Sequence, residues 1–488
     1  MRIVLPFLCA FALAGCGASG ADGPVNVAII GDSDELFQNG LRLATSAQHL
    51  RAATHEGLVA LDPSGQAIPA IAERWIITDD GKSYIFRLRD MEWPDGESLT
   101  AQQVRRLLLD KQRRLQATSL GLDLAKVEEV RAMTGRVIEV RLTAAMPEFL
   151  RLLAQPEMGF SKDGAGMGPM TLERADGQLV AQLTALPPEA RGFSAREDWQ
   201  ERAKQVFVKA IPAQQAVDAF GDGEVDLVLN GRLAHLPLAD TGPLTRGTVR
   251  IDAAWGQFGL VVRKETGLLG AAPLREALSM AIDRTDLMQP FNIGGWLPSN
   301  EIVPRELWED VEPEALEWAE WPIERRQAEA SRRVSAWVAE AGEGANVTIG
   351  MPEGPGSQQL FDEIAEDFAA IGVQSRLVPA GSGADLTLHD RVSRYASPRW
   401  YLNQFHCEVR TGPCSPEADA LVVQSLSVND PAEKADLLAQ AELELTDAHV
   451  FIAFGAPIRW SLVRSSVTGY QENRWGLHPL FPLSQPTI

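Results

Sequence analysis

The sequence is short of several kinds of residue, and each shortage excludes a class of protein. Its 488 residues include four cysteines, seven histidines and four tyrosines, and 45 Lys and Arg face 66 Asp and Glu. A formal net charge of -21 without any run of basic residues excludes a nucleic-acid partner, because a phosphate backbone calls for clustered Lys and Arg. The same charge would be repelled by an anionic membrane surface.

Long apolar runs are absent apart from one at the N-terminus. The run Ile3 to Ala14 follows a single positive residue, Arg2, and is too short to span a bilayer, which predicts an export signal over residues 1–15. The run ends in Leu13-Ala14-Gly15-Cys16, which resembles a bacterial lipobox with an acylated Cys16. An ordinary secretory signal followed by a chance cysteine is the alternative. Residues 16–23 are small and turn-rich, which predicts a flexible tether.

Catalytic motifs are also missing. The chain has no H-E-x-x-H, no G-x-S-x-G after a strand and no Walker A sequence. The glycines of Gly166 to Met170 lack the Lys and the spacing of a phosphate-binding loop. The acids Glu224 and Asp226 fit a helix-to-strand turn better than a metal or acid/base site. We therefore expect no enzymatic activity and no cofactor, and a catalytic pair assembled only by folding is the alternative.

The few cysteines agree with export. Cys9 lies in the signal, Cys16 is the proposed lipid site, and Cys407 and Cys414 remain. In an oxidising compartment these two are predicted to form a disulfide. His406 beside Cys407 suggests a metal ligand, but no further ligands occur at a standard spacing, so we expect no metal.

The most informative stretch of the chain is Thr54 to Val104, where turn signals separate short alternating strands. Tyr84, Phe86 and Leu88 fall on one face of a strand with a two-residue period. Thr100, with Gln103 three residues later, has the spacing of a capping box and predicts a helix start.

Four pieces of this stretch, in order, resemble the extracytoplasmic solute-binding proteins of ABC transporters, in the family of the oligopeptide-, dipeptide- and nickel-binding proteins. The pieces are Glu56 to Val59, Asp62 to Trp75, Asp80 to Arg89 and Trp93 to Val104. A further family signature, Leu274 to Arg284, has its apolar residues on one helical face, which indicates core packing rather than a site.

The resemblance implies an α/β fold with two lobes, each a mixed sheet flanked by helices, joined by a hinge. It places lobe I at residues 24–262 and 453–488, with an inserted subdomain at about 58–165, and lobe II at 263–452. The chain would then cross between lobes near Arg263 and Ala453. Alternating helices and strands in lobe II agree with a mixed sheet, and Ser357 is expected to cap one of those helices.

The function implied by the resemblance is that of a periplasmic lipoprotein, a monomer attached to a membrane only through its lipid. It would capture a peptide-like or other small ligand between its lobes and deliver it to an ABC transporter permease. The alternatives are a sensor or chaperone-like binding protein on the same fold, and a secreted enzyme.

One departure from the family concerns the ligand. Peptide-binding members carry W-x-A-D-Y-x-x-P in the second lobe, and the Asp holds the peptide's α-ammonium group. Counted from Asp385 without a gap, this chain places Arg391 at the Trp position, Arg394 at the Asp position and Tyr395 at the Tyr position. Inverted charge favours an acidic or amino-blocked peptide or another small anion. His55, Trp255 and Tyr395 are the expected pocket walls. Alternatively, the loop is rebuilt and Arg394 faces solvent or pairs with Asp390.

Overall fold

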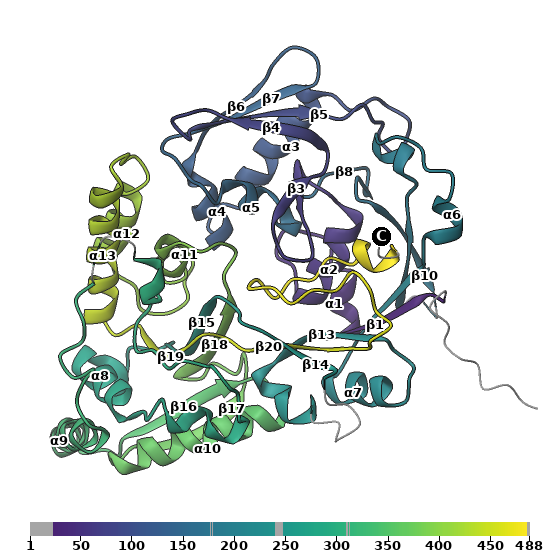
Figure 1. Cartoon of the computed structure of the whole chain (residues 1–488). Helices are drawn as coiled ribbons and strands as arrows, with labels where there is room; N and C mark the ends of the chain where they lie inside the picture. The colour runs from purple at the N-terminus through teal and green to yellow at the C-terminus, as the bar shows by residue number, and fades with distance from the viewer. Residues whose placement is uncertain are drawn as a thin grey trace, which may run out of the picture.

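The structure is a computed structural model that describes residues 23–485, except residues 176, 178, 240–246, 309, 310 and 312. The expected signal peptide, Cys16 and all but the last residue of the tether lie outside the described residues. Two large sheets with their helices form two lobes, and a smaller sheet stands above the first lobe (Figure 1). The fold is thus the two-lobed α/β arrangement expected from the sequence.

The sheet of the first lobe has seven strands. Its centre is β1, whose sequence VNVAII is buried at five of six positions and pairs in parallel with both β12 and β13. Apolar residues on both faces are typical of a central parallel strand. In spatial order the strands are β10 (Met170–Ala175), β11 (Val180–Ala185), β12 (Val206–Ile211), β1 (Val25–Ile30), β13 (Leu227–Arg232), β20 (Arg459–Val463) and β14 (Val249–Asp252).

Helices cover both faces of this sheet. Val27 and Ile29 of β1 pack on one face with the helix α2, whereas Ala28 and Ile30 pack on the other face with α7. This division follows from the two-residue period of a strand. The helices of this lobe are α1 (Ser33–Leu36), α2 (Thr45–Thr54), α6 (Trp199–Arg202) and α7 (Ala213–Gly221), with α7 below the sheet and α1 and α2 above it in Figure 1.

An antiparallel four-stranded sheet is built from the inserted stretch of the chain. Tyr84, Phe86 and Leu88 of β5 are buried, as their alternation predicted, and the capping box of Thr100 and Gln103 is present at the start of α3. The elements are β4 (Ala72–Ile77), β5 (Ser83–Leu88), β7 (Val137–Leu142) and β6 (Val127–Ala132), with α3 (Ala101–Arg114), α4 (Ser119–Asp123) and α5 (Phe149–Leu153). Two small hairpins lie nearby, β2 (Val59–Leu61) with β3 (Ala67–Pro69) and β8 (Ser161–Lys162) with β9 (Ala165–Gly166).

The second lobe contains a five-stranded sheet. In spatial order its strands are β17 (Gln374–Pro379), β16 (Asn346–Met351), β18 (Leu386–Val392), β15 (Gly256–Val262) and β19 (Phe451–Gly455). Its helices are α8 (Ala272–Ala281), α9 (Ile323–Ala341), α10 (Pro355–Ala370), α11 (Pro398–Asn403), α12 (Pro416–Gln424) and α13 (Pro431–Asp447). Ser357 lies inside α10, which has Gly354 as its N-cap, so the expectation of a cap at Ser357 is wrong.

The chain passes between the two large sheets at residues 253–255 and again at 456–458, because β14 and β20 belong to the first sheet whereas β15 and β19 belong to the second. The crossings expected near Arg263 and Ala453 are therefore displaced to the far ends of β15 and β19. All seven residues of β15 are buried. A strand that is buried on both faces fits the interior of either sheet, so its sequence does not indicate which sheet it joins.

Candidate functional site

A cavity of about 350 Å³ lies between the two lobes. The first lobe contributes the end of β13 and the start of β20, and the second lobe contributes the end of β18 and the residues that follow it. The side chains around it are Leu43, Thr45, Gln48, Leu61, Arg151, Gln155, Arg232, Asp390, Arg391, Val392, Ser393, Arg394, Trp400, Gln404, Arg459, Trp475, Gly476 and Leu477.

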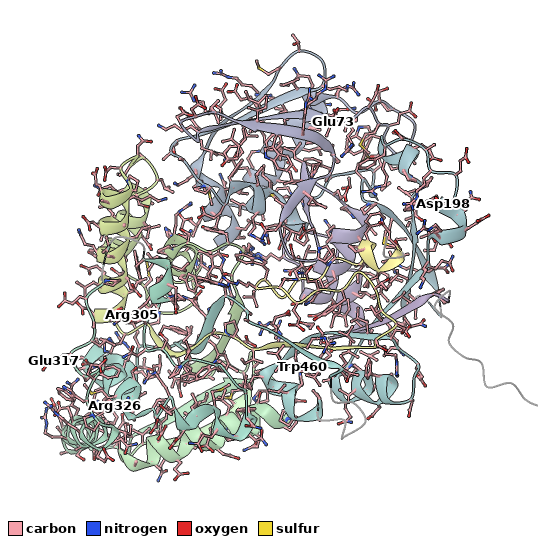
Figure 2. The ribbon with its side chains drawn as sticks, viewed as in Figure 1. Glu73, Asp198, Arg305, Glu317, Arg326 and Trp460 are labelled. Carbon is pink, nitrogen blue, oxygen red and sulfur yellow. A yellow bond between two sulfur atoms is a disulfide. The ribbon has the colours of Figure 1, made fainter. Side chains whose placement is uncertain are left out.

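The lining of this cavity includes five arginines and one carboxylate. We call the cavity the arginine cavity. The carboxylate of Asp390 is already paired: Arg459 approaches it at 2.6 Å, and both side chains are nearly buried. The pair joins β18 of the second lobe to β20 of the first. Positive charge in the cavity contrasts with the formal net charge of -21 of the whole chain, whose outer edge carries both acids such as Glu317 and arginines such as Arg326 (Figure 2).

The other four guanidinium groups have neutral or distant partners among the described residues. Arg391 donates to Gln404 Oε1 at 3.3 Å, and Arg232 donates to Thr45 Oγ1 at 3.2 Å. Arg394 donates to Ser119 Oγ at 3.0 Å, and the nearest Glu157 oxygen is 3.9 Å away. Arg151 lies over the Trp475 ring at 3.6 Å, and its buried Nη1 has no hydrogen-bond partner in the described part of the chain.

These surroundings disfavour the charged forms of the arginines. Burial lowers the pKa of Arg391, and the neighbouring charges of Arg394, Arg263 and Arg232 lower it further. Arg391 is exposed to the space of the cavity but enclosed by protein on its other sides. Burial also lowers the pKa of Arg151 to about 10, so this group is still charged at neutral pH. A negative charge placed in the cavity would relieve this repulsion and replace lost hydration.

Two of the arginines are neighbours because of sheet register. Arg232 and Arg459 are direct partners in the antiparallel pair of β13 and β20. Like charges directly opposite each other destabilise a sheet. Asp390 forms an ion pair with Arg459 alone. The strand register therefore places more positive than negative charge on the side of the cavity that the first lobe forms.

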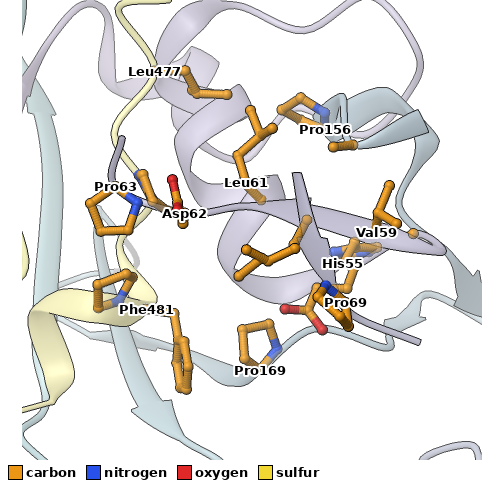
Figure 3. Close-up of a pocket in the computed structure, with 18 of the residues that line it drawn as sticks. His55, Val59, Leu61, Asp62, Pro63, Pro69, Pro156, Pro169, Leu477 and Phe481 are labelled. Atoms are coloured by element: carbon orange, nitrogen blue, oxygen red, sulfur yellow. The ribbon is translucent and has the colours of Figure 1, made fainter. Parts of the chain in front are cut away.

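The residues expected at the site from the sequence are divided among three places. Arg391 and Arg394 both line the arginine cavity. His55 lines a second cavity of about 320 Å³ in the first lobe, shown in Figure 3. Trp255 and Tyr395 line neither of these two cavities, and their role as pocket walls stays a prediction. Trp255 is half-buried beneath Arg474, whose guanidinium lies 5.6 Å from its ring.

Tyr395 instead joins the inserted subdomain to the second lobe. Its hydroxyl donates to Asp123 Oδ1 at 2.7 Å, and Asn403 Nδ2 donates to the same oxygen at 2.8 Å. Arg399 donates to the backbone carbonyls of Leu122 and Asp123. Asp123 is fully buried, and this burial raises its pKa. We call this contact between α4 and α11 the Asp123 contact. The alternative pairing of Arg394 with Asp390 is not present, because Asp390 pairs with Arg459.

The comparisons with known proteins identify the family. The family described as "Bacterial extracellular solute-binding proteins, family 5 Middle" matches residues 66–408. The chain belongs to this family. Among curated relatives, the periplasmic oligopeptide-binding protein OppA of Salmonella typhimurium is 22% identical over 520 residues, which cover 94% of this chain and 93% of OppA.

Solved structures have the same fold as this family 5 protein. Haemophilus influenzae OppA in complex with RPPGFSPFR superimposes with a TM-score of 0.79 at 17% identity, covering 96% of this chain and all of that one. The binding protein AgaA from A. tumefaciens R10, in complex with agropinic acid, superimposes with a TM-score of 0.71 at 17% identity. This superposition covers 96% of this chain and 99% of AgaA.

Three arginines of the cavity in this solute-binding protein were missed in the sequence. Arg232 ends the apolar strand β13, Arg459 begins the apolar strand β20, and Arg151 lies on the short helix α5. A charged residue at the end of a buried strand is the signal that could have indicated the first two. Their separation along the chain, however, hides the fact that they meet.

The two remaining cysteines are joined. Cys407 and Cys414 form a disulfide with a Cα–Cα distance of 5.3 Å, as expected for an exported chain. Beside it, His406 Nδ1 lies 3.6 Å from Asp419. In the described ranges, no cluster of His, Cys, Asp or Glu has the arrangement of a metal site. The same ranges contain no helix that is long and apolar enough to cross a membrane.

Proposed function

We propose that this family 5 protein captures a small anionic solute in the arginine cavity and delivers it to the permease of an ABC transporter. The observation that carries this proposal is a set of four guanidinium groups contributed by both lobes. Among the described residues, Arg151, Arg232 and Arg391 have no ion-pair partner, and Arg394 has only the Glu157 carboxylate at 3.9 Å. A guanidinium binds carboxylates and phosphates through paired N–H donors, so one anion can satisfy several of these groups at once.

The start of α2 adds a second source of positive potential. Thr45 and Gln48 of its first turns line the cavity, and Ala44 at the N-cap has no side chain to cap the helix. The N-terminus of a helix carries a partial positive charge and free amides that favour anions. AgaA, which has the same fold, was solved with an acid, agropinic acid. An anionic ligand is therefore compatible with this architecture.

A peptide with a free amino terminus fits the cavity poorly. Its α-ammonium group would need a carboxylate, and the one carboxylate in the lining, that of Asp390, is held by Arg459. The volume of about 350 Å³ lies near the lower limit for small-molecule sites, which favours a small ligand. We infer that the solute is a small di- or tricarboxylate or another compact anion, or a short acidic or amino-blocked peptide.

Capture is proposed to close the lobes. The ligand would bridge Arg232 of the first lobe and Arg391 of the second, with the connections at 253–255 and 456–458 as the hinge. We take lobe I as residues 24–252 and 459–485, with the inserted subdomain, and lobe II as residues 256–455. Periplasmic binding proteins use this kind of hinge closure, and the closed form would be the one that the permease recognises.

Attachment to the membrane is proposed to depend on a lipid at Cys16. The acidic surface offers no electrostatic attraction to anionic lipids, and acyl chains supply the anchor instead. Cys16→Ser is expected to release the protein from the membrane fraction of the producing cells. If the variant still sediments with membranes, another element anchors the chain.

A thermal-shift panel tests the choice of ligand. Succinate, citrate, acetylated acidic dipeptides and unblocked neutral peptides are compared on the full exported protein. A ligand at a hundred times its Kd adds about 2.7 kcal/mol to the stability of the form that binds it. We expect the anions to raise the melting temperature and the unblocked neutral peptides to leave it unchanged. Stabilisation by the neutral peptides alone would contradict an anionic solute.

A further inference from the structure

The second cavity, of about 320 Å³, lies directly beside the arginine cavity. Leu61, Gln155 and Leu477 line both of them. The walls of the second cavity are rich in rigid apolar residues, several of which are visible around it in Figure 3. Its prolines are Pro63, Pro69, Pro156, Pro169, Pro479 and Pro482. We call this space the proline pocket.

Charged groups in the proline pocket are already matched by the protein. Glu56 lies 3.6 Å from Arg191, and both are largely buried. Asp62 accepts hydrogen bonds within its own turn. His55 is bonded to Thr54 Oγ1 at 2.7 Å, and burial lowers its pKa to about 3, so the ring is neutral at physiological pH. The pocket therefore differs from its neighbour, because it offers apolar surface without an excess of positive charge.

The three residues that line both cavities lie at the boundary between them. Leu61 ends the short strand β2, Leu477 belongs to the C-terminal segment, and both are half-buried. Gln155 follows α5 and is held by it, since its Nε2 donates to Arg151 O at 3.1 Å. Rotation of two leucine side chains about their χ angles can open this boundary, and such rotations are fast for partly exposed residues.

We propose that the two cavities form one elongated site, and that the solute is an amphipathic anion whose acidic group lies among the arginines while its apolar part enters the proline pocket. This inference rests on the proposed function, because the acidic group is the part held by the arginine cavity. An apolar tail that is buried in the proline pocket strengthens binding. Each buried methylene raises the affinity about fourfold. Selectivity among anions would then come from the proline pocket.

The test compares two probes with the same acidic group, succinate and 2-octylsuccinate. Both are titrated calorimetrically into the wild-type protein and into Arg391→Met. We expect octylsuccinate to bind at least about 50-fold more tightly than succinate, because several methylenes are buried. Both probes should bind Arg391→Met at least about tenfold more weakly, since the shared acidic group loses a charge-assisted partner.

Filling the proline pocket locates the apolar tail. Ala60 lines the pocket from β2, and Ala60→Phe should remove most of the gain from the octyl group while succinate binds as before. Ala67 lies in the same hairpin and lines neither cavity, so Ala67→Phe is the matched control and should keep the gain. If Ala60→Phe does not fold, Ala52→Phe fills the pocket from α2.

The outcomes separate the two proposals. Equal affinities for the two probes, with succinate still dependent on Arg391, overturn the elongated site but leave the anion site intact. If 2-octylsuccinate still binds more tightly than succinate in both Ala60→Phe and Ala52→Phe, the octyl tail lies elsewhere. This result also overturns the inference. If neither probe binds, or if both bind Arg391→Met as tightly as wild type, the proposed function itself fails and the inference fails with it.

Discussion

The two lobes meet at two regions in which protein encloses charged side chains. The regions differ in whether a ligand can reach the charged group. At the Asp123 contact, the carboxylate is fully buried and its Oδ1 accepts hydrogen bonds from Tyr395 and Asn403. At the arginine cavity, Arg391 is exposed to open space and has one amide partner at 3.3 Å. The first region is closed to solvent, whereas the second lines a cavity of about 350 Å³.

Burial disfavours the charged form in both regions. It raises the pKa of Asp123 and lowers the pKa of Arg391. A shifted pKa therefore does not by itself distinguish a structural contact from a binding site. The distinction comes from access, and it can be tested by changing each region separately.

The largest expected effect is on stability, at the Asp123 contact. Asp123→Ala leaves the Tyr395 hydroxyl and the Asn403 amide buried without an acceptor, and we expect it to lower the free energy of unfolding by about 3 kcal/mol. Urea unfolding followed by circular dichroism measures the change. Asp110→Ala is the control, because Asp110 is exposed on α3 and its pairs with Arg113 and Arg114 should contribute less than about 1 kcal/mol. Equal losses in the two variants would contradict a structural role for the Asp123 contact.

The next prediction concerns the one carboxylate in the lining of the arginine cavity. Its removal raises the positive charge of the cavity. Asp390→Asn removes the carboxylate that pairs with Arg459 at 2.6 Å, so a further buried guanidinium loses its partner. We expect the ligand-free protein to lose about 2 kcal/mol of stability and to bind succinate several-fold more tightly. Melting curves with and without succinate measure both changes. Weaker succinate binding in this variant would mean that Asp390 helps to hold the ligand.

A smaller effect concerns pH. The pKa of Asp123 is raised in the folded protein, so above the ordinary aspartate pKa of about 3.9 the unfolded chain loses its proton first. The folded state then binds more protons, and the free energy of unfolding contributed by Asp123 falls as the pH rises through this window. Asp123→Asn should remove that decline when urea unfolding is compared at pH values between about 4 and 7. A steeper decline in Asp123→Asn would contradict the raised pKa.

Local features of the fold could be predicted from the sequence, whereas contacts between residues far apart in the sequence could not. The alternation of Tyr84 and Phe86 and the capping box at Thr100 are encoded within a few residues, and both are present. By contrast, β15 is buried at every position, so its sequence is compatible with either lobe. Ser357 is a good capping residue by type, but helix α10 begins two residues earlier, at Pro355.

The candidate site was predicted only where a motif could be counted along the chain. Arg391 and Arg394 follow Asp385 closely, so their departure from the family pattern is visible in the sequence. Arg232 and Arg459 meet through the register of β13 and β20, which no local pattern encodes. Tyr395 keeps its place in the motif but faces the protein interior, because its hydroxyl bonds to Asp123 of the inserted subdomain.

The most direct test of the anion site is calorimetric titration of succinate into a charge-reversal variant, Arg391→Glu. The control is Arg376→Glu, which makes the same change at an exposed position of β17 outside the cavity. We expect Arg391→Glu to bind succinate at least about 100-fold more weakly than wild type, because a carboxylate now repels the ligand where a guanidinium held it. Arg376→Glu should bind succinate as wild type does. Equal succinate affinity in Arg391→Glu and wild type would contradict an anion held between the lobes by these arginines.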